Sequence, residues 1–139
     1  MHMKRFNVIK YLLILTMFIA TGCDEITTDQ TFTIGKESTF RLNQLYYSTD
    51  GQYAFQINEI SDSRCPEGLM CIWSGEVSLK GEWSHSGTKT AVEVHTVMKD
   101  LQKEPEGFTI TITDAIPYPK YGSDSKTENL VVTLLIKKI

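Results

Sequence analysis

The sequence predicts a small all-β domain, an antiparallel β-sandwich, over residues 31–139. Three observations lead to this prediction. Short runs rich in β-branched and aromatic residues recur along this region, and several alternate apolar with polar positions. Gly, Pro, Asn, Asp and Ser separate the runs. No convincing helical period occurs in the region. Such a series of short strands favours a sandwich, with a small β-barrel as the alternative.

The first half of the region contains four predicted strands. They are Thr31–Ile34, Ser38–Leu42, Leu45–Ser48 and Tyr53–Ile60. Asp50-Gly51 lies between the third and the fourth, which indicates a β-hairpin. In the fourth strand, alternate residues are Tyr53, Phe55 and Ile57, so one face of this strand is expected to lie in the core.

The second half contains four more predicted strands and a long loop. The strands are Glu76–Ser84, Thr90–Met98, Gly107–Thr113 and Leu130–Ile136, and the loop spans residues 115–127. In the first of these strands Gly81 shares the inner face with Trp83, where it would leave room for a ring. In the second, Met98 is expected inside and His95 outside. The last strand is apolar on both faces, which predicts a central strand of a covered sheet.

Residues 1–22 form a predicted signal peptide. Lys4, Arg5 and Lys10 are its only charged residues, and they precede or border an apolar run, Tyr11–Ala20. This run of about ten residues suits a signal peptide, whereas crossing a bilayer takes about 20. Ala20-Thr21-Gly22-Cys23 resembles the lipobox of bacterial lipoproteins, with Ala20 where Leu is usual. The resemblance implies cleavage before Cys23 and lipid on its thiol. An ordinary secretory signal and an uncleaved anchor are the alternatives.

Residues 23–30 are expected to form the lipidated cysteine and a polar tether to the domain. At about 3.3 Å per residue, the tether after Cys23 could reach about 20–25 Å. Asp24-Glu25 resembles sorting signals for the cell surface, while Asp24 alone resembles an inner-membrane retention signal, and both residues also suit an ordinary linker. We therefore expect a lipid-anchored protein of the bacterial cell envelope, with the outer membrane or cell surface favoured over the inner membrane.

The charge of the mature chain argues against two kinds of partner. Removing residues 1–22 leaves 11 basic and 17 acidic residues, a formal charge of −6. Nucleic-acid binding needs clustered Lys and Arg, so we expect no nucleic-acid partner. Adhesion to anionic lipid by charge is disfavoured for the same reason. Attachment to the membrane should come from acyl chains, at about 0.8 kcal/mol for each buried CH₂ group.

One segment, residues 62–76, is dense in Cys, Pro, Gly and Trp. In an exported chain whose Cys23 carries lipid, Cys65 and Cys71 are an even pair, and a disulfide between them is the default. The segment reads Asp-Ser-Arg-Cys-Pro, four residues, then Cys-x-Trp-x-Gly-Glu. It resembles a family of small, functionally uncharacterised bacterial lipoproteins that share this motif. The resemblance implies a fold and a location, but no reaction.

The motif has a structural and a functional interpretation. Arg64 is expected to pair with Asp62 or Glu76 or to donate to loop carbonyls, and Trp73 to pack on the disulfide or cap the core. As a binding loop, the motif would offer Arg64, Trp73 and Glu76 as contacts. Cys-x5-Cys is not the usual zinc spacing, so no metal and no cofactor are expected.

No catalytic set is predicted either. Ser84-His85-Ser86 places a hydroxyl beside a base, but no Gly-rich oxyanion loop accompanies it. The sequence therefore favours a non-enzymatic binding or structural module of the cell envelope, whose partner is an envelope protein or a glycan. The alternative is an inhibitor or accessory protein of an envelope enzyme.

Overall fold

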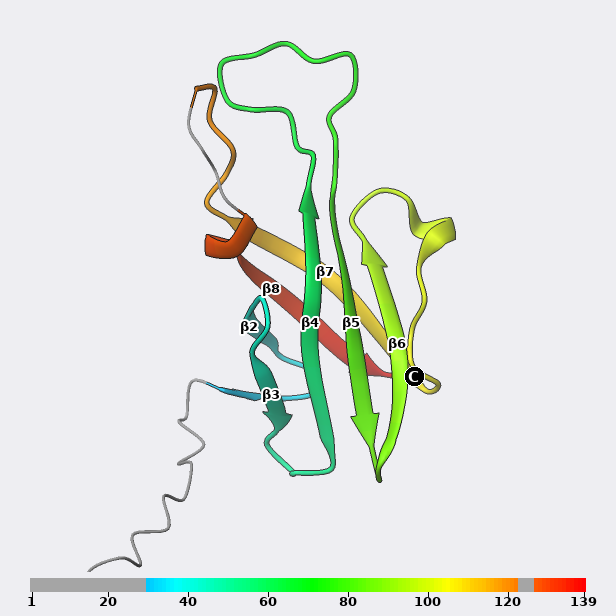
Figure 1. The fold of residues 1–139 in the computed structure, drawn as a ribbon. Helices are drawn as coiled ribbons and strands as arrows, with labels where there is room; N and C mark the ends of the chain where they lie inside the picture. Colours follow the sequence, from blue (N-terminus) through cyan, green and yellow to red (C-terminus); the bar gives the residue numbers. More distant parts are fainter. Residues whose placement is uncertain (1–29, 123–126) are drawn as a thin grey trace, which may run out of the picture.

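The computed structural model describes residues 30–122 and 127–139. The predicted signal peptide, Cys23 and almost all of the tether lie outside the described residues. Within these two ranges, eight strands and two short 3₁₀ helices follow one another (Figure 1). They are β1 (Thr31–Phe32), β2 (Glu37–Arg41), β3 (Leu45–Ser48), β4 (Tyr53–Asp62), β5 (Val77–His85), β6 (Thr88–His95), η3 (Lys99–Leu101), β7 (Phe108–Ile116), η4 (Thr127–Asn129) and β8 (Val131–Lys138).

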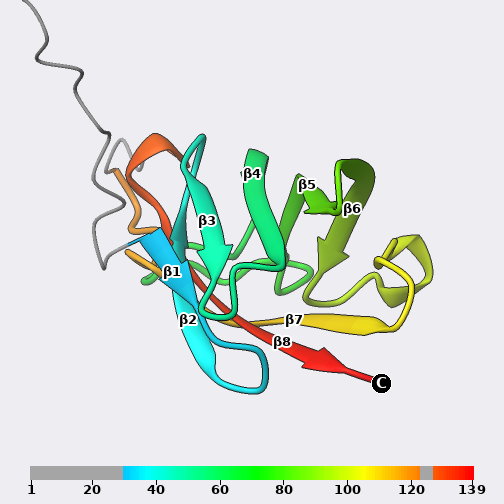
Figure 2. The ribbon, with the colours of Figure 1, turned by 90° about the horizontal axis from the view of Figure 1, so that it is seen from below.

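The strands form two separate sheets. One has five strands in the order β1-β3-β4-β5-β6, and the other has three in the order β2-β8-β7. Figure 2 shows the three-stranded sheet lying across one face of the larger one. All pairings are antiparallel except that of β1 with β3. The sheets stay open and do not close into a barrel, so the predicted β-sandwich is confirmed.

The core lies between the two sheets and follows the period-two pattern of the strands. Val77, Leu79 and Trp83 are buried along β5, as predicted. A Cβ atom added to Gly81 would lie 2.4 Å from the backbone oxygen of Gln56 and 3.1 Å from the ring of Phe55. Gly81 therefore does leave room for a ring. The other buried apolar residues are Phe32, Phe40, Tyr46, Phe55, Ile57, Ile60, Val92, Val94, Phe108, Ile110, Ile112, Ala115, Leu130, Val132, Leu134 and Ile136.

β4 and β7 each pass through a β-bulge, and each ends later than predicted. The pairing of β4 with β5 shifts register between Ile57 and Glu59, and β4 then continues to Asp62. The pairing of β7 with β8 shifts between Ile112 and Asp114, and β7 continues to Ile116. The loop that was expected from residue 115 therefore begins only after Ile116.

Two expectations about individual strands are corrected. β6 ends at His95, so Met98 is exposed and does not belong to the core. β8 is central in its sheet, as predicted, but only one of its faces is fully buried. The residues on its other face are half-buried, and no other strand or helix of the described residues forms a layer over the three-stranded sheet there.

A search for membrane-crossing helices within residues 30–122 and 127–139 finds none that is long and apolar enough.

Candidate functional site

The motif segment forms a long loop between β4 and β5, which we call the stapled loop (residues 63–76). It extends from one end of the sandwich (Figure 1). The chain enters the domain toward the opposite end, where Thr31 pairs with Tyr47 and Phe32 with Ser48, next to the turn between β3 and β4. β4 is 10 residues long. Its two ends therefore lie about 30 Å apart.

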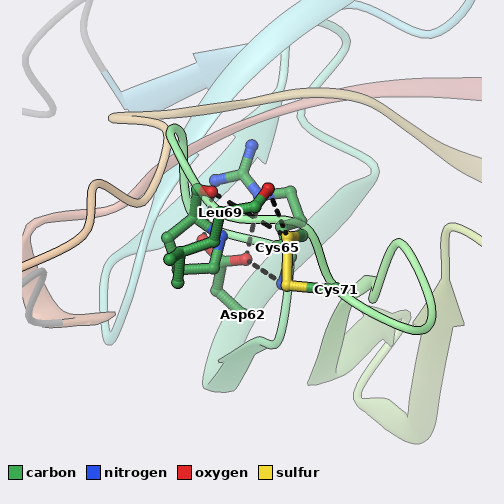
Figure 3. The surroundings of a disulfide bond; sticks show 6 residues. Asp62, Cys65, Leu69 and Cys71 are labelled. Atoms are coloured by element: carbon green, nitrogen blue, oxygen red, sulfur yellow. Dashed lines mark hydrogen bonds and ion pairs between the residues drawn. A yellow bond between two sulfur atoms is a disulfide. The ribbon is translucent and has the colours of Figure 1, made fainter.

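A disulfide closes the loop upon itself. Cys65 and Cys71 are bonded, with an S–S distance of 2.15 Å and a Cα–Cα distance of 5.9 Å (Figure 3). The amide of Cys65 also donates to the carbonyl of Ser74 at 2.9 Å, and the amide of Leu69 donates to the carbonyl of Pro66 at 3.2 Å. The disulfide predicted from the even cysteine pair is therefore present.

Arg64 fastens the base of the loop to the end of β7. Its guanidinium donates to both carboxylate oxygens of Asp62, at 2.8 and 2.7 Å, and to the carbonyls of Ala115 at 2.7 Å and Pro117 at 3.1 Å. The ring of Tyr118 lies 4.6 Å from the guanidinium carbon. The hydrogen bonds to Asp62 raise the pKa of Arg64 above its usual value, against the effect of burial. The guanidinium is thus occupied within the domain.

Glu76 fastens the other end of the loop to the segment after β6. One carboxylate oxygen lies 3.1 Å from Nδ1 of His95, and the other accepts the amides of Val97 at 3.2 Å and Met98 at 3.0 Å. Burial alone would raise the pKa of Glu76, but the hydrogen bonds from Met98, His95 and Val97 outweigh it and lower the pKa below its usual value. Glu76 is therefore an ionised, buried acceptor.

His95 differs from its sequence prediction. It lies on the face of β6 opposite Val94, as an outward residue would, but it is buried because the segment after β6 folds back beside it. Its Nε2 lies 3.4 Å from a carboxylate oxygen of Glu93. That nitrogen makes no hydrogen bond within the described part of the chain.

Ser63 and Gly75 bring the two ends of the loop together. The amide of Ser63 donates to the carbonyl of Glu76 at 2.8 Å, and the amide of Glu76 donates to the hydroxyl of Ser63 at 3.1 Å. Gly75 has a φ of +72°, and a Cβ atom there would lie 1.8 Å from the carbonyl oxygen of Ser63. Only glycine fits this position.

The far end of the loop carries four exposed apolar side chains, Leu69, Met70, Ile72 and Trp73, which we call the apolar tip. Relative exposures reach 103% for Met70 and 108% for Ile72, and Trp73 is 49% exposed. Among the backbone hydrogen bonds of the described residues outside strands and helices, none uses an amide of residues 70–73. Single exposed apolar residues are common, but four within five positions form a patch.

The three residues predicted as binding contacts therefore have different surroundings. Arg64 and Glu76 use their charged groups inside the domain. Trp73 is half-exposed and does not cap the core, in which Trp83 is the buried tryptophan. Sequence reasoning did not single out Met70 and Ile72. The available signal was an apolar run, Leu-Met-Cys-Ile-Trp, in a loop otherwise rich in turn residues.

A cleft of about 310 Å³ lies between the base of the loop and the end of β7. Arg64, Glu76, Ile112, Ala115 and Tyr118 are among the residues that line it. Arg64 and Glu76 are both engaged by protein groups. Asp114 also lines the cleft, and one of its carboxylate oxygens accepts the amide of Ala115 at 2.8 Å. Within the described ranges, no cluster of three or more His, Cys, Asp or Glu residues could hold a metal ion. His85 stacks on Tyr53, with ring centroids 4.7 Å apart.

Comparison with protein families, with curated proteins and with solved structures finds no match to this chain.

Proposed function

We propose that this protein is a lipid-anchored lipoprotein of the bacterial cell envelope that binds another envelope protein through the apolar tip of its stapled loop. In this proposal the domain catalyses no reaction of its own. It holds a short, rigid, apolar segment away from the membrane, where a partner with a matching apolar pocket can reach it.

The observation that carries the proposal is that some motif residues hold the loop in place while others are exposed to solvent. Asp62, Ser63, Arg64, Gly75 and Glu76 are each used to hold the loop in place. Met70 and Ile72, by contrast, are fully exposed. Folding gains nothing from exposed apolar side chains, whereas burying one against a partner is worth about 1.5–3 kcal/mol.

The place of the loop in the domain also supports the proposal. The tether that follows Cys23 would enter the sandwich next to the turn between β3 and β4. The stapled loop starts at the far end of β4, about 30 Å away. A tether of about 20–25 Å would thus place the domain near the membrane with its loop directed outward.

The chemistry of the tip favours a protein over a glycan. Sugars are recognised through convergent hydrogen-bonding groups and flat aromatic rings. The two most exposed tip residues, Met70 and Ile72, offer neither, and the one aromatic ring of the tip, Trp73, is only half-exposed. An apolar pocket lined by a protein is the surface that such side chains fit best.

Site-specific photocrosslinking in living cells tests the proposal. A photoreactive amino acid would replace Met70 in the tip, and Gln52 in the turn at the opposite end of the domain would serve as the control. Both side chains are exposed, so neither replacement disturbs the core. We expect a discrete protein adduct from position 70 and none from position 52. Equal labelling from both positions, or no adduct from position 70, would contradict the proposal.

A further inference from the structure

We propose that the partner is an endopeptidase with an apolar primary pocket, and that the stapled loop occupies its substrate cleft as a slowly cleaved inhibitor. This inference rests on the proposed function, because it names the class of protein that the tip binds. It assigns Met70 to the primary pocket and the Met70–Cys71 peptide bond to the catalytic groups of the peptidase.

The backbone of the apolar tip is accessible to a partner. Peptide-binding clefts recognise an extended chain through main-chain hydrogen bonds and through pockets for alternate side chains. The loop amides from Met70 to Trp73 form none of the backbone bonds found in the described residues. Met70 and Ile72 are two positions apart and both stand clear of the protein. The tip thus provides unpaired backbone groups together with two alternate apolar side chains.

The disulfide determines which side chains of the tip face outward. The Cys71 side chain is turned back to Cys65 by the disulfide bond (Figure 3). The chain bends at Ile72 and Trp73, and the exposures of Met70 and Ile72 show that both side chains are directed outward. Both side chains are fully exposed, which agrees with this arrangement. A pocket can therefore take Met70 without displacing any other part of the domain.

The disulfide would also hold the two products of cleavage at Met70–Cys71 together. The nucleophile of the peptidase would attack the Met70 carbonyl carbon and form an acyl bond, while the peptide bond breaks and the Cys71 nitrogen leaves as an amine with the proton of the nucleophile. The disulfide spans this bond, because Met70 lies between Cys65 and Cys71. The leaving amine consequently stays beside the acyl group. Its return, which restores the peptide bond and the nucleophile, competes with attack by water.

The segments on either side of the apolar tip are held in place by the rest of the domain. The loop is fastened through Arg64 to Ala115 and Pro117, through Glu76 to Met98, and through a backbone hydrogen bond from Glu67 to Pro119 at 3.0 Å. A segment already held in its bound shape loses little conformational entropy when it binds. The same fastenings keep the two new ends together after cleavage. Both effects distinguish an inhibitor from an ordinary flexible substrate.

Inhibition kinetics with two kinds of peptidase test the inference. The full-length protein, purified in detergent, would be added to chymotrypsin or elastase, which have apolar primary pockets, and to trypsin, whose pocket contains a carboxylate. We expect slow, tight inhibition of at least one apolar-pocket enzyme and none of trypsin. Met70→Lys should weaken the inhibition of the apolar-pocket enzyme by at least about tenfold. The same change should strengthen the binding of trypsin by at least about tenfold, so that trypsin is inhibited. Leu101→Lys, at an exposed apolar residue outside the loop and its fastenings, should behave like the wild type.

Reduction of the disulfide provides a second readout. After reduction and alkylation, the loop should be cleaved at Met70–Cys71 at the rate of an ordinary substrate, and inhibition should disappear. The inference is overturned if the oxidised protein is cleaved there rapidly without inhibiting, or if Met70→Lys gains no inhibition of trypsin. A protein adduct at position 70 in cells together with no inhibition would leave the proposed function standing and remove only this inference.

Discussion

At the scale of single residues, Arg64 and Glu76 each use one charged group to join segments that are far apart in the sequence. Arg64 reaches residues 51 and 53 positions away, and Glu76 reaches residues 21 and 22 positions away. Both charges are largely removed from water, so each needs the hydrogen bonds that it makes. Arg64 and Glu76, which the sequence suggested as binding contacts, therefore hold the domain together.

Glu76→Gln tests this role through its pH dependence. The pKa of Glu76 is lowered below its ordinary value of 4.5 in the folded domain. Its contribution to stability is therefore fully present above about pH 4.5 and is lost as the pH falls through the lower, folded pKa. We expect Glu76→Gln to lower the free energy of unfolding by about 1–3 kcal/mol at neutral pH and to flatten its acid dependence.

Urea denaturation across the acid range measures this effect. Glu59→Gln is the matched control, since Glu59 is exposed and makes only a surface ion pair with Lys80 at 3.3 Å. The control should follow the wild type at every pH. Parallel pH dependence of Glu76→Gln and the wild type would show that the carboxylate contributes nothing to the acid response.

The sequence limits what can be predicted for such residues. Asp62 was one of the predicted partners of Arg64, with Glu76 and loop carbonyls as the alternatives, because Asp62 is only two residues away in the sequence. The contact with the carbonyl of Ala115 in β7 was not predicted.

The burial of His95 was not predicted either. It depends on the segment after β6 folding back, where the amide and carbonyl of Lys103 pair with those of Glu93. No local pattern around His95 reports this contact.

At the scale of elements, the strands follow from the pattern and the stapled loop follows from its fastenings. Strict alternation in β4, β5 and β7 made the core faces predictable. The continuation of β7 past its bulge was not predicted, because an extra residue reverses the alternation there. β4 was predicted across its bulge to Ile60, and only its last two residues were missed. The loop has no repeating pattern, so its shape depends on the disulfide and the polar contacts at its base.

Replacement of both Cys65 and Cys71 by Ser tests the part played by the disulfide. A ring this small restricts the unfolded chain modestly, so the free energy of unfolding should fall by about 2–3 kcal/mol. The far-ultraviolet circular dichroism spectrum should remain that of a β protein, because neither cysteine belongs to the core. Thiol titration of the denatured wild type should find no free thiol from this pair. Loss of the β spectrum would show that the disulfide builds the fold rather than one loop.

At the scale of the whole molecule, the proposed lipid and the proposed contact surface lie at opposite ends of the protein. Cys23 precedes a domain whose first strand lies next to the turn between β3 and β4. The stapled loop lies beyond the opposite end of β4. In the proposed function, this arrangement places the stapled loop within reach of a partner.

The lipid end has its own test. Cys23→Ala should abolish labelling with a radioactive fatty acid and leave an unprocessed precursor, because the thiol is the proposed site of attachment. Ala20→Leu restores the usual lipobox residue and should be labelled at least as well as the wild type. Mass spectrometry that found an unmodified mature N-terminus at another residue of the wild type would exclude lipidation at Cys23.

The free energy of unfolding of a tip variant tests the central claim most directly. Met70, Ile72 and Trp73 would all be changed to Ser, and urea denaturation would compare this variant with the wild type and with Arg64→Ala. If the tip serves a partner and not the fold, the triple variant should stay within about 0.5 kcal/mol of the wild type. Arg64→Ala should lose about 3 kcal/mol, because it leaves Asp62 without its partner. A triple variant as unstable as Arg64→Ala would show that these side chains stabilise the domain, and the claim of a contact surface would be wrong.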